Sequence, residues 1–185
     1  MGIFLYKTFS SPFNPYTIVW EEEESKIRIE RIFLSDAELK SDKKALNTFK
    51  TVKLGSSPSI ILLNEKIQRF FKGEDIKFHL NLLNFNRCFE FQTKVLLAES
   101  EIPRGWISTY KRIAEHLGKS NASRVVGNAL AKNPFPIMIP CHRAIRSDGD
   151  LGGFQGGITM KHSLLELEGI KFSDKGKVIM NRIYY

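Results

Sequence analysis

Three stretches near the start of the chain have the hydrophobic patterning of β-strands. They are rich in β-branched and aromatic residues, and one of them alternates polar and apolar positions with a period of two. They are IFLYKTF (3–9), YTIVWEE (16–22) and KIRIERIFL (26–34). Helical patterns follow in ALNTFKTVK (45–53) and ILLNEKIQRFFKG (61–73), and IKFHLNLLNF (76–85) is expected to be a further strand. These elements predict a small N-terminal α/β domain over residues 1–86.

From about residue 87 the pattern becomes helical. FEFQTKVLLAESEI (89–102) is amphipathic, and STYKRIAEHLG (108–118) follows after a breaker. We expect Ser108 to be the N-cap of this second helix and Gly118 to end it. A third helix, NASRVVGNALAK (121–132), comes directly afterwards. The sequence therefore predicts a mainly helical domain over residues 87–170.

The helix at 121–132 has two different faces. Helical spacing predicts one buried face, made of Ala122, Val125, Val126, Ala129 and Leu130. The opposite face carries Asn121, Arg124, Asn128 and Lys132, and Gly127 lies beside it. A helix, a short turn and a second helix with a polar, basic face indicate a helix-turn-helix. Many buried helix pairs have the same pattern, so the pattern alone does not distinguish the two.

Positive charge is concentrated in the same region. The formal net charge of the chain is +8, and residues 104–146 hold eight bases against the single acid Glu115. A solvated basic face is one interpretation, and a surface that binds nucleic acid is the other.

The segment NPFPIMIPCHRAI (133–145) combines three prolines with one of only two cysteines. We expect an extended, rigid segment, because each proline fixes a φ angle and removes an N–H donor. It leads to Cys141, which is followed by His142, Arg143 and Arg146. Neighbouring positive charge or a histidine base would make this thiol reactive. A buried, inert cysteine is the alternative, and Cys88, which lacks such neighbours, is assigned no role.

The helix TMKHSLLELEG (159–169) offers a group that could orient His142. Glu168 falls within the apolar arc of this helix, so we expect it to point inward and to need a partner. His142 is one candidate partner, and the local Lys161 is the other. The preceding loop RSDGDLGGFQGG (146–157) is rich in glycine, which suits close approach to a ligand or a flexible connector.

The cysteine count bounds the remaining classes of site. Two cysteines cannot form a disulfide framework, and no CxxC or Cys/His cluster suggests zinc. We therefore expect no metal, and a reducing intracellular compartment, cytoplasmic or nuclear.

These motifs together resemble the O6-alkylguanine-DNA alkyltransferases, the methylated-DNA–protein-cysteine methyltransferases. IPCHRAI, preceded by GNALAKNPFPIM and followed by LGGFQGG and LLELEG, carries the resemblance, which spans about residues 91–169. It implies an α+β fold with a ribonuclease-H-like N-terminal domain (1–86), a C-terminal helix-turn-helix domain (87–170) and a tail (171–185). It also implies a monomer that binds duplex DNA, needs no cofactor, flips the damaged guanine out of the stack and takes its alkyl group once only.

The resemblance assigns roles by position. Cys141 is the alkyl acceptor, His142 takes its proton through a water, and Glu168 orients His142. Asn133 holds the turn before the cysteine, and Tyr110 contacts a phosphate and donates a proton to the leaving guanine. Arg124 is the finger that fills the vacated stack. The other implied DNA contacts are Asn121, Gly127, Asn128 and Lys132, and the implied pocket residues are Ile139, Ala144, Gly152, Gly153, Phe154 and Gln155.

Two positions depart from the family pattern. Phe154 stands where many members have tyrosine, and Gln155 where several have serine, so the size of the pocket and its contact with guanine O6 stay open. Three other functions remain to be weighed: a lesion-binding relative that does not repair, a helix-turn-helix regulator with a structural cysteine, and a cysteine hydrolase. The presence of Cys141 favours repair over the first, and the adjacency of Cys141 and His142 disfavours the last.

Overall fold

The computed structural model describes residues 3–23 and 26–185, which form two compact units of mixed α+β structure. The first unit comprises the described residues up to Asn84 together with Pro134–Met138, and the second comprises Phe85–Asn133 and Ile139–Tyr185. No helix in the described part of the chain is long and apolar enough to cross a membrane.

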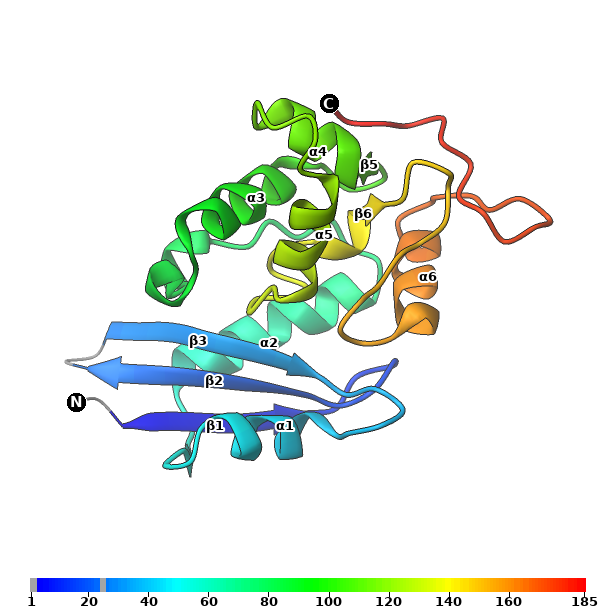
Figure 1. Ribbon diagram of the computed structural model, residues 1–185. Helices are drawn as coiled ribbons and strands as arrows, with labels where there is room; N and C mark the ends of the chain where they lie inside the picture. The colour runs from blue at the N-terminus through cyan, green and yellow to red at the C-terminus, as the bar shows by residue number, and fades with distance from the viewer. Residues whose placement is uncertain (1–2, 24–25) are drawn as a thin grey trace. The chain divides into compact units, whose positions relative to one another are not determined.

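The first unit is built on a four-stranded sheet (Figure 1). Its strands are β1 (Phe4–Phe9), β2 (Tyr16–Glu23), β3 (Lys26–Leu34) and β4 (Lys53–Leu54), in the order β3-β2-β1-β4. The first three pair antiparallel, and β4 pairs parallel with β1. The three long strands thus form where the alternating, β-branched pattern predicts them.

Both faces of the central strand β2 are covered by helices. The helices are α1 (Ser41–Thr48) and α2 (Pro58–Phe71). Val19 packs with Ala45 of α1, whereas Tyr16 lies edge-on to Phe71 and hydrogen-bonds to Asn64 of α2. Residues on alternate sides of a strand therefore meet different helices, which explains why the run from Tyr16 to Trp20 is buried throughout.

The predicted strand at 76–85 is wrong. This segment contains a short 3-10 helix, η1 (Leu80–Leu82), and only an isolated bridge between Leu83 and Ile29. The strand assignment rested on apolar residues in LNLLNF, but the side chains of η1 are not buried. Leu83 is the one buried residue of this segment and its other apolar side chains are only partly buried, so the fully buried face expected of a core strand does not form.

The second unit holds four α-helices and a two-stranded parallel sheet. The helices are α3 (Glu90–Glu101), α4 (Tyr110–His116), α5 (Ser123–Ala131) and α6 (Ile158–Leu167), and the strands are β5 (Ser108–Thr109) and β6 (Ala144–Ile145). Two 3-10 helices, η2 (Phe85–Arg87) and η3 (Cys141–Arg143), complete it. Helix α5 packs against α3 and α4, and η3 contacts both α3 and α6.

Two local predictions in this unit need correction. Ser108 lies in β5, and the N-cap of α4 is Thr109, whose hydroxyl accepts a hydrogen bond from the backbone N–H of Arg112. In α5, Val126, Ala129 and Leu130 are buried as expected, but Val125 is 51% exposed. The buried stripe of α5, which packs against α3 and α4, is therefore narrower than predicted.

The C-terminal residues 171–185 pack within the second unit. Phe172, Val178 and Ile183 contact the core around Ile107 and Leu165. The backbone N–H of Ile107 donates to the carbonyl of Arg182, and that of Tyr184 donates to the carbonyl of Ile107. The tail, for which the sequence offered no assignment, is therefore part of the fold of this unit.

The proline-rich segment before Cys141 is a turn and is not extended as expected. Ile137, which forms the turn together with Met138, has a φ of 74°, in the left-handed region. Glycine normally takes that position, and a β-branched residue there is strained. The segment is nevertheless well anchored, since Phe135 and Ile137 are buried and the carbonyl of Pro134 accepts from the Ile32 N–H.

Candidate active site

Cys141 lies in η3 and is only 6% exposed. Burial raises the pKa of its thiol to about 12, and the hydrogen bond from Asn133 and the charge of Lys161 oppose this only in part. The resting group is therefore a neutral thiol. The predicted charge from Arg143 and Arg146 does not act on the sulfur, because Arg143 pairs with Glu168 and Arg146 is exposed.

The next residue, His142, is fully buried and lies 3.0 Å through Nε2 from Oε1 of Glu168. Glu168 follows α6 directly and points inward, as helical spacing predicted. Burial lowers the pKa of His142, which favours the neutral imidazole. An ionised carboxylate only accepts hydrogen bonds, so Nε2 carries the hydrogen and Nδ1 is the basic nitrogen.

Glu168 is held by more than His142. The Arg143 guanidinium donates to both of its oxygens, from Nε at 2.9 Å and from Nη2 at 2.8 Å. Burial alone would raise the pKa of Glu168, but His142 and Arg143 together lower it to about 2. The carboxylate is therefore ionised at neutral pH. Lys161, the alternative partner considered for Glu168, donates instead to the carbonyls of Ala144 and Leu151, at 2.6 and 2.5 Å.

Asn133 is buried, and its Nδ2 donates to the carbonyl of Ile139 at 3.3 Å. Its side chain also hydrogen-bonds to the Cys141 thiol. One amide group thus links the end of α5, the residue before Pro140 and the sulfur. A residue so placed holds the thiol in one position relative to η3.

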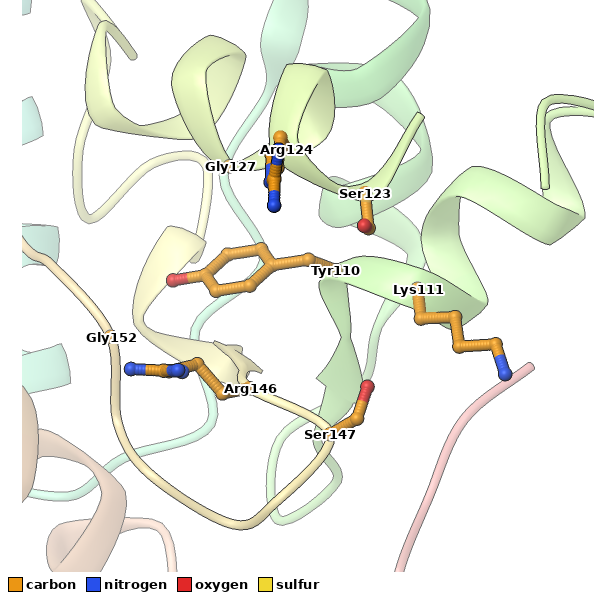
Figure 2. A pocket seen from close by; sticks show the side chains of 8 residues that line it. All are labelled: Tyr110, Lys111, Ser123, Arg124, Gly127, Arg146, Ser147 and Gly152. Carbon is orange, nitrogen blue, oxygen red and sulfur yellow. The ribbon is translucent and has the colours of Figure 1, made fainter. Parts of the chain in front are cut away.

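An open pocket of about 390 Å³ lies beside this group of residues (Figure 2). Figure 2 shows the ring of Tyr110 between the side chains of Arg124, from α5, and Arg146, from the loop after β6. The full lining is Tyr110, Lys111, Ser123, Arg124, Gly127, Arg146, Ser147 and Gly152. Its three basic side chains suit an anionic ligand such as a phosphodiester.

Glycine is required at one point of this lining. Gly152 has a φ of +69°, and a Cβ built on it would lie 2.5 Å from the Tyr110 hydroxyl. The backbone of the glycine-rich loop therefore passes close to the Tyr110 ring, which no larger residue at 152 would permit. Gly153, by contrast, has open space around it.

The structure brings some of the expected residues together and leaves others apart. Tyr110, Arg124, Gly127 and Gly152 line the pocket, whereas Asn121 lines a second hollow at the turn between α4 and α5. Asn128 and Lys132 are exposed on α5 and line neither. Ile139 and Ala144 are fully buried next to η3, Gly153 is exposed, and Phe154 and Gln155 are half-buried, with the Phe154 ring 6.3 Å from that of His142.

The concentration of positive charge is only partly a surface property. Arg143 is internal, and the carbonyl of Leu167 accepts a hydrogen bond from Arg104. Arg112 likewise donates to the C-terminal residue Tyr185. Of the eight bases, those left for a partner are chiefly Lys111, Lys119, Arg124, Lys132 and Arg146, all of which are exposed.

The burial and pairing of three groups near the thiol, Arg143, Lys161 and Glu99, were not predicted from the sequence. Arg143 was counted with the basic stretch, although its place next to His142 could have suggested the pairing with Glu168. Lys161 falls in the same arc of α6 as Leu164, Leu165 and Glu168, so the helical spacing that found Glu168 also predicts an inward Lys161. Glu99 likewise follows Val95 and Leu96 on the buried face of α3.

No group of three or more potential metal ligands occurs among the residues that the structure describes. Both cysteines are free thiols.

Comparison with known proteins gives a consistent family. Residues 90–170 match the family described as "6-O-methylguanine DNA methyltransferase, DNA binding domain". A methylated-DNA–protein-cysteine methyltransferase of Methanothermobacter thermautotrophicus is 46% identical over 117 residues, which cover 62% of this chain and 65% of that protein. One of the same name from Metallosphaera sedula is 33% identical over 169 residues, covering 89% of this chain and 92% of the relative.

A solved structure has the same fold. The OGT of Mycobacterium tuberculosis in complex with DNA is 30% identical, covers 89% of this chain and 93% of its own, and superposes with a TM-score of 0.70. Its match extends over both the sheet-containing and the helical regions. Because the Metallosphaera sedula relative is 33% identical and is matched over 92% of its own length, the chain belongs to the methylated-DNA–protein-cysteine methyltransferase family.

Proposed function

We propose that this protein repairs O6-alkylguanine in duplex DNA by moving the alkyl group onto the sulfur of Cys141. The observation that carries the proposal is the buried series Cys141–His142–Glu168, in which a neutral thiol adjoins a histidine oriented by an ionised carboxylate. Because burial holds the resting sulfur as a thiol, a general base is needed to start the reaction. His142, as a neutral imidazole, is that base.

The proposed reaction balances its protons. The Cys141 thiol gives its proton through a water to Nδ1 of His142, and the sulfur attacks the alkyl carbon. The C–O6 bond breaks, its electron pair goes to guanine, and the Tyr110 phenol donates a proton to the base. The proton held by His142 is then transferred to the Tyr110 phenolate, which restores the neutral forms of both residues. The products are guanine and a thioether on Cys141, so each molecule reacts once, without cofactor or metal.

Tyr110 suits the part of a neutral donor. Burial raises the pKa of its phenol to about 12, and nearby Glu99 and Cys141 act in the same direction. The phenol therefore keeps its proton until a more basic group is placed against it. Gly152 leaves the room that the Tyr110 hydroxyl needs.

We further propose that α4 and α5 form a helix-turn-helix that binds DNA. Arg124 is exposed on α5 beside the pocket, where it can enter the base stack after the guanine has flipped. Gly127 would allow close approach of the DNA backbone, and Asn121, Asn128 and Lys132 are exposed for contacts along the strand. The pocket between Arg124 and Gly152 is the proposed entrance for the flipped nucleotide, with Ile139, Ala144, Gly153, Phe154 and Gln155 deeper along its path.

The finer points of architecture are also proposals. An antiparallel β1–β3 meander with β4 parallel to β1 supports a ribonuclease-H-like N-terminal domain over residues 1–86. Residues 87–170 would be the DNA-binding and transfer domain, and 171–185 its tail. We propose a monomer, since one chain supplies every group in the scheme, and a reducing compartment that holds DNA, since the acceptor works only as a free thiol.

Mass spectrometry of the reacted protein tests this function. Trypsin releases residues 133–143 as one peptide, which contains Cys141 and not Cys88. After incubation with a duplex that carries O6-methylguanine, we expect this peptide to gain one methyl group and the DNA to contain guanine. DNA binding without methyl uptake by the reduced protein would instead identify a lesion-binding protein that does not repair.

A further inference from the structure

Glu99 is a buried carboxyl that the proposed reaction does not use. It lies on α3, its exposed fraction is 0%, and no donor among the described residues makes a well-aligned hydrogen bond to either of its carboxylate oxygens. An ionised carboxylate is costly to bury without donors, so such a position needs a reason.

Hydrogen bonds near Glu99 connect α3 and α6 to the segment around η3, which carries Cys141. One turn further along α3, the carbonyl of Ile102 accepts a hydrogen bond from Arg143 Nη1 at 2.5 Å, which fastens the helix to η3. From α6, Lys161 donates to the carbonyl of Ala144, the residue directly after η3. Glu99 therefore lies where α3 meets the segment that carries the acceptor cysteine.

Ionisable groups from α6, η3, α4 and the C-terminal tail interact with Glu99. Lys161 approaches from α6 and Arg143 from η3, and both charges lower the pKa of Glu99. The interaction with Glu99 in turn raises the pKa of three weak acids: Cys141 in η3, Tyr110 in α4 and Tyr185 in the tail. The backbone N–H of Ala144 is the neutral donor turned toward it.

The charge state of this group of residues at neutral pH follows from burial. Burial raises the pKa of Glu99 to about 8, so its carboxyl keeps a proton at neutral pH. Burial lowers the pKa of Lys161 to about 8, but three carbonyl oxygens and the Tyr110 ring, 5.9 Å away, surround its ammonium. The neutral-pH protein therefore holds a positive charge beside Cys141 and no negative charge at Glu99.

We propose that Glu99 is a positioning residue whose protonation state sets the net charge next to the acceptor sulfur of Cys141. While its carboxyl is protonated, the Lys161 ammonium stabilises the negative charge that develops on Cys141 during attack. When the carboxyl ionises, it neutralises Lys161 and repels the sulfur. The role rests on the proposed function of Cys141 as the acceptor.

The direction of the effect does not depend on Lys161 keeping its proton. Repulsion from ionised Glu99 acts on Cys141 more strongly than attraction to Lys161. At alkaline pH, the Cys141 thiol of a variant with a neutral side chain at position 99 is therefore at least as acidic as that of the wild type. Below the pKa of Glu99 the two proteins have the same charge, so their thiols should react alike.

The test compares Glu99→Gln with the wild type across pH. Glutamine keeps the shape of the protonated carboxyl, and Glu90→Gln, an exposed carboxyl on the same helix, is the matched control. The full-length proteins react with iodoacetamide, and the rate is read from the peptide 133–143 by mass, with Cys88 as the internal reference. Methyl transfer from the O6-methylguanine duplex is measured in parallel.

We expect a ratio of the Glu99→Gln rate to the wild-type rate of about one near pH 6.5 and of about three or more near pH 9.5, since one pKa unit is a tenfold change in thiolate. Glu90→Gln should follow the wild type throughout. A constant ratio across this range, or a slower Glu99→Gln protein near pH 9.5, overturns the proposal.

A measurement on the unmodified protein keeps the proposal testable if Glu99→Gln does not fold. In protein labelled with ¹³C at the glutamate carboxyls, one carboxyl signal should titrate near pH 8. If every glutamate titrates below about pH 6, Glu99 is ionised at neutral pH and the proposal fails. The iodoacetamide rates need no DNA, so an absence of methyl transfer would count against the proposed function and leave the result for Glu99 intact.

Discussion

The Arg143 guanidinium donates to both carboxylate oxygens of Glu168, and His142 shares one of these oxygens at 3.0 Å. One buried anion thus fixes the orientation of the histidine and neutralises the arginine that is tied to the end of α3. All three residues lie within the same compact unit.

Glu168→Gln should slow methyl transfer on the order of 10²-fold, because a neutral amide no longer favours the protonated form of His142. The rate is measured with the O6-methylguanine duplex under single-turnover conditions. Glu166→Gln is the matched control, since Glu166 is exposed on the same helix and pairs with His162. An unchanged rate in Glu168→Gln would show that the carboxylate does not act on the base.

The same carboxylate should make stability depend on pH. Its pKa is about 2 in the folded protein, against 4.5 for the ordinary group. A lowered pKa stabilises the fold above the ordinary value, and this stability is lost as the pH falls from about 4.5 toward 2. The shift corresponds to about 3 kcal/mol. Urea unfolding of the wild type and of Glu168→Gln is measured at several pH values. The difference between their free energies of unfolding should shrink by about this amount in acid, and a constant difference would contradict the assignment.

Cys141→Ala should abolish alkyl uptake and leave DNA binding intact. The cysteine is buried and lines no part of the open pocket, so its removal does not alter the surface offered to DNA. Binding is measured by fluorescence anisotropy with damaged and undamaged duplexes. Cys88→Ala serves as the control and should transfer normally, whereas loss of transfer in that variant would require a second acceptor.

Arg124→Ala should slow repair of duplex DNA by about tenfold or more, because the variant no longer stabilises the state in which the guanine is flipped out. Each 1.4 kcal/mol of lost stabilisation lowers the population of that state about tenfold. The reaction with the free base O6-benzylguanine needs no flipping and should keep its rate. Comparison of the two substrates therefore separates flipping from chemistry. Equal losses with both would place Arg124 in the chemical step.

Gly152→Ala should slow transfer by up to about 10²-fold, because the added Cβ would lie 2.5 Å from the Tyr110 hydroxyl and the backbone φ is +69°. Gly153→Ala is the matched control, as nothing lies within 4 Å of its Cβ position. Both variants are compared in rate and in thermal stability. Similar rates in the two would mean that Tyr110 tolerates displacement.

Local patterns in the sequence predict the strands and helices that have a clearly buried face. The strands β1–β3 and the helices α2 and α5 form where period-two or helical spacing indicates them. Helical spacing also predicted that the Glu168 side chain, directly after α6, points inward. Where one side of an element is exposed, spacing alone was less reliable. Val125 is on the predicted buried face of α5 and is exposed, and in the segment 76–85, predicted as a strand, only Leu83 is buried.

Residue types and motif order in the sequence were sufficient to identify the family and to single out Cys141 and His142 as the proposed acceptor and its base. Only the tertiary structure decided how the charges pair. Arg143 and Lys161 come from separate elements, and their partners are backbone carbonyls or a carboxylate distant in sequence. Burial then sets whether Cys141 is a thiol and whether Glu99 holds a proton, because desolvation depends on what packs around a group and not on its neighbours in the chain.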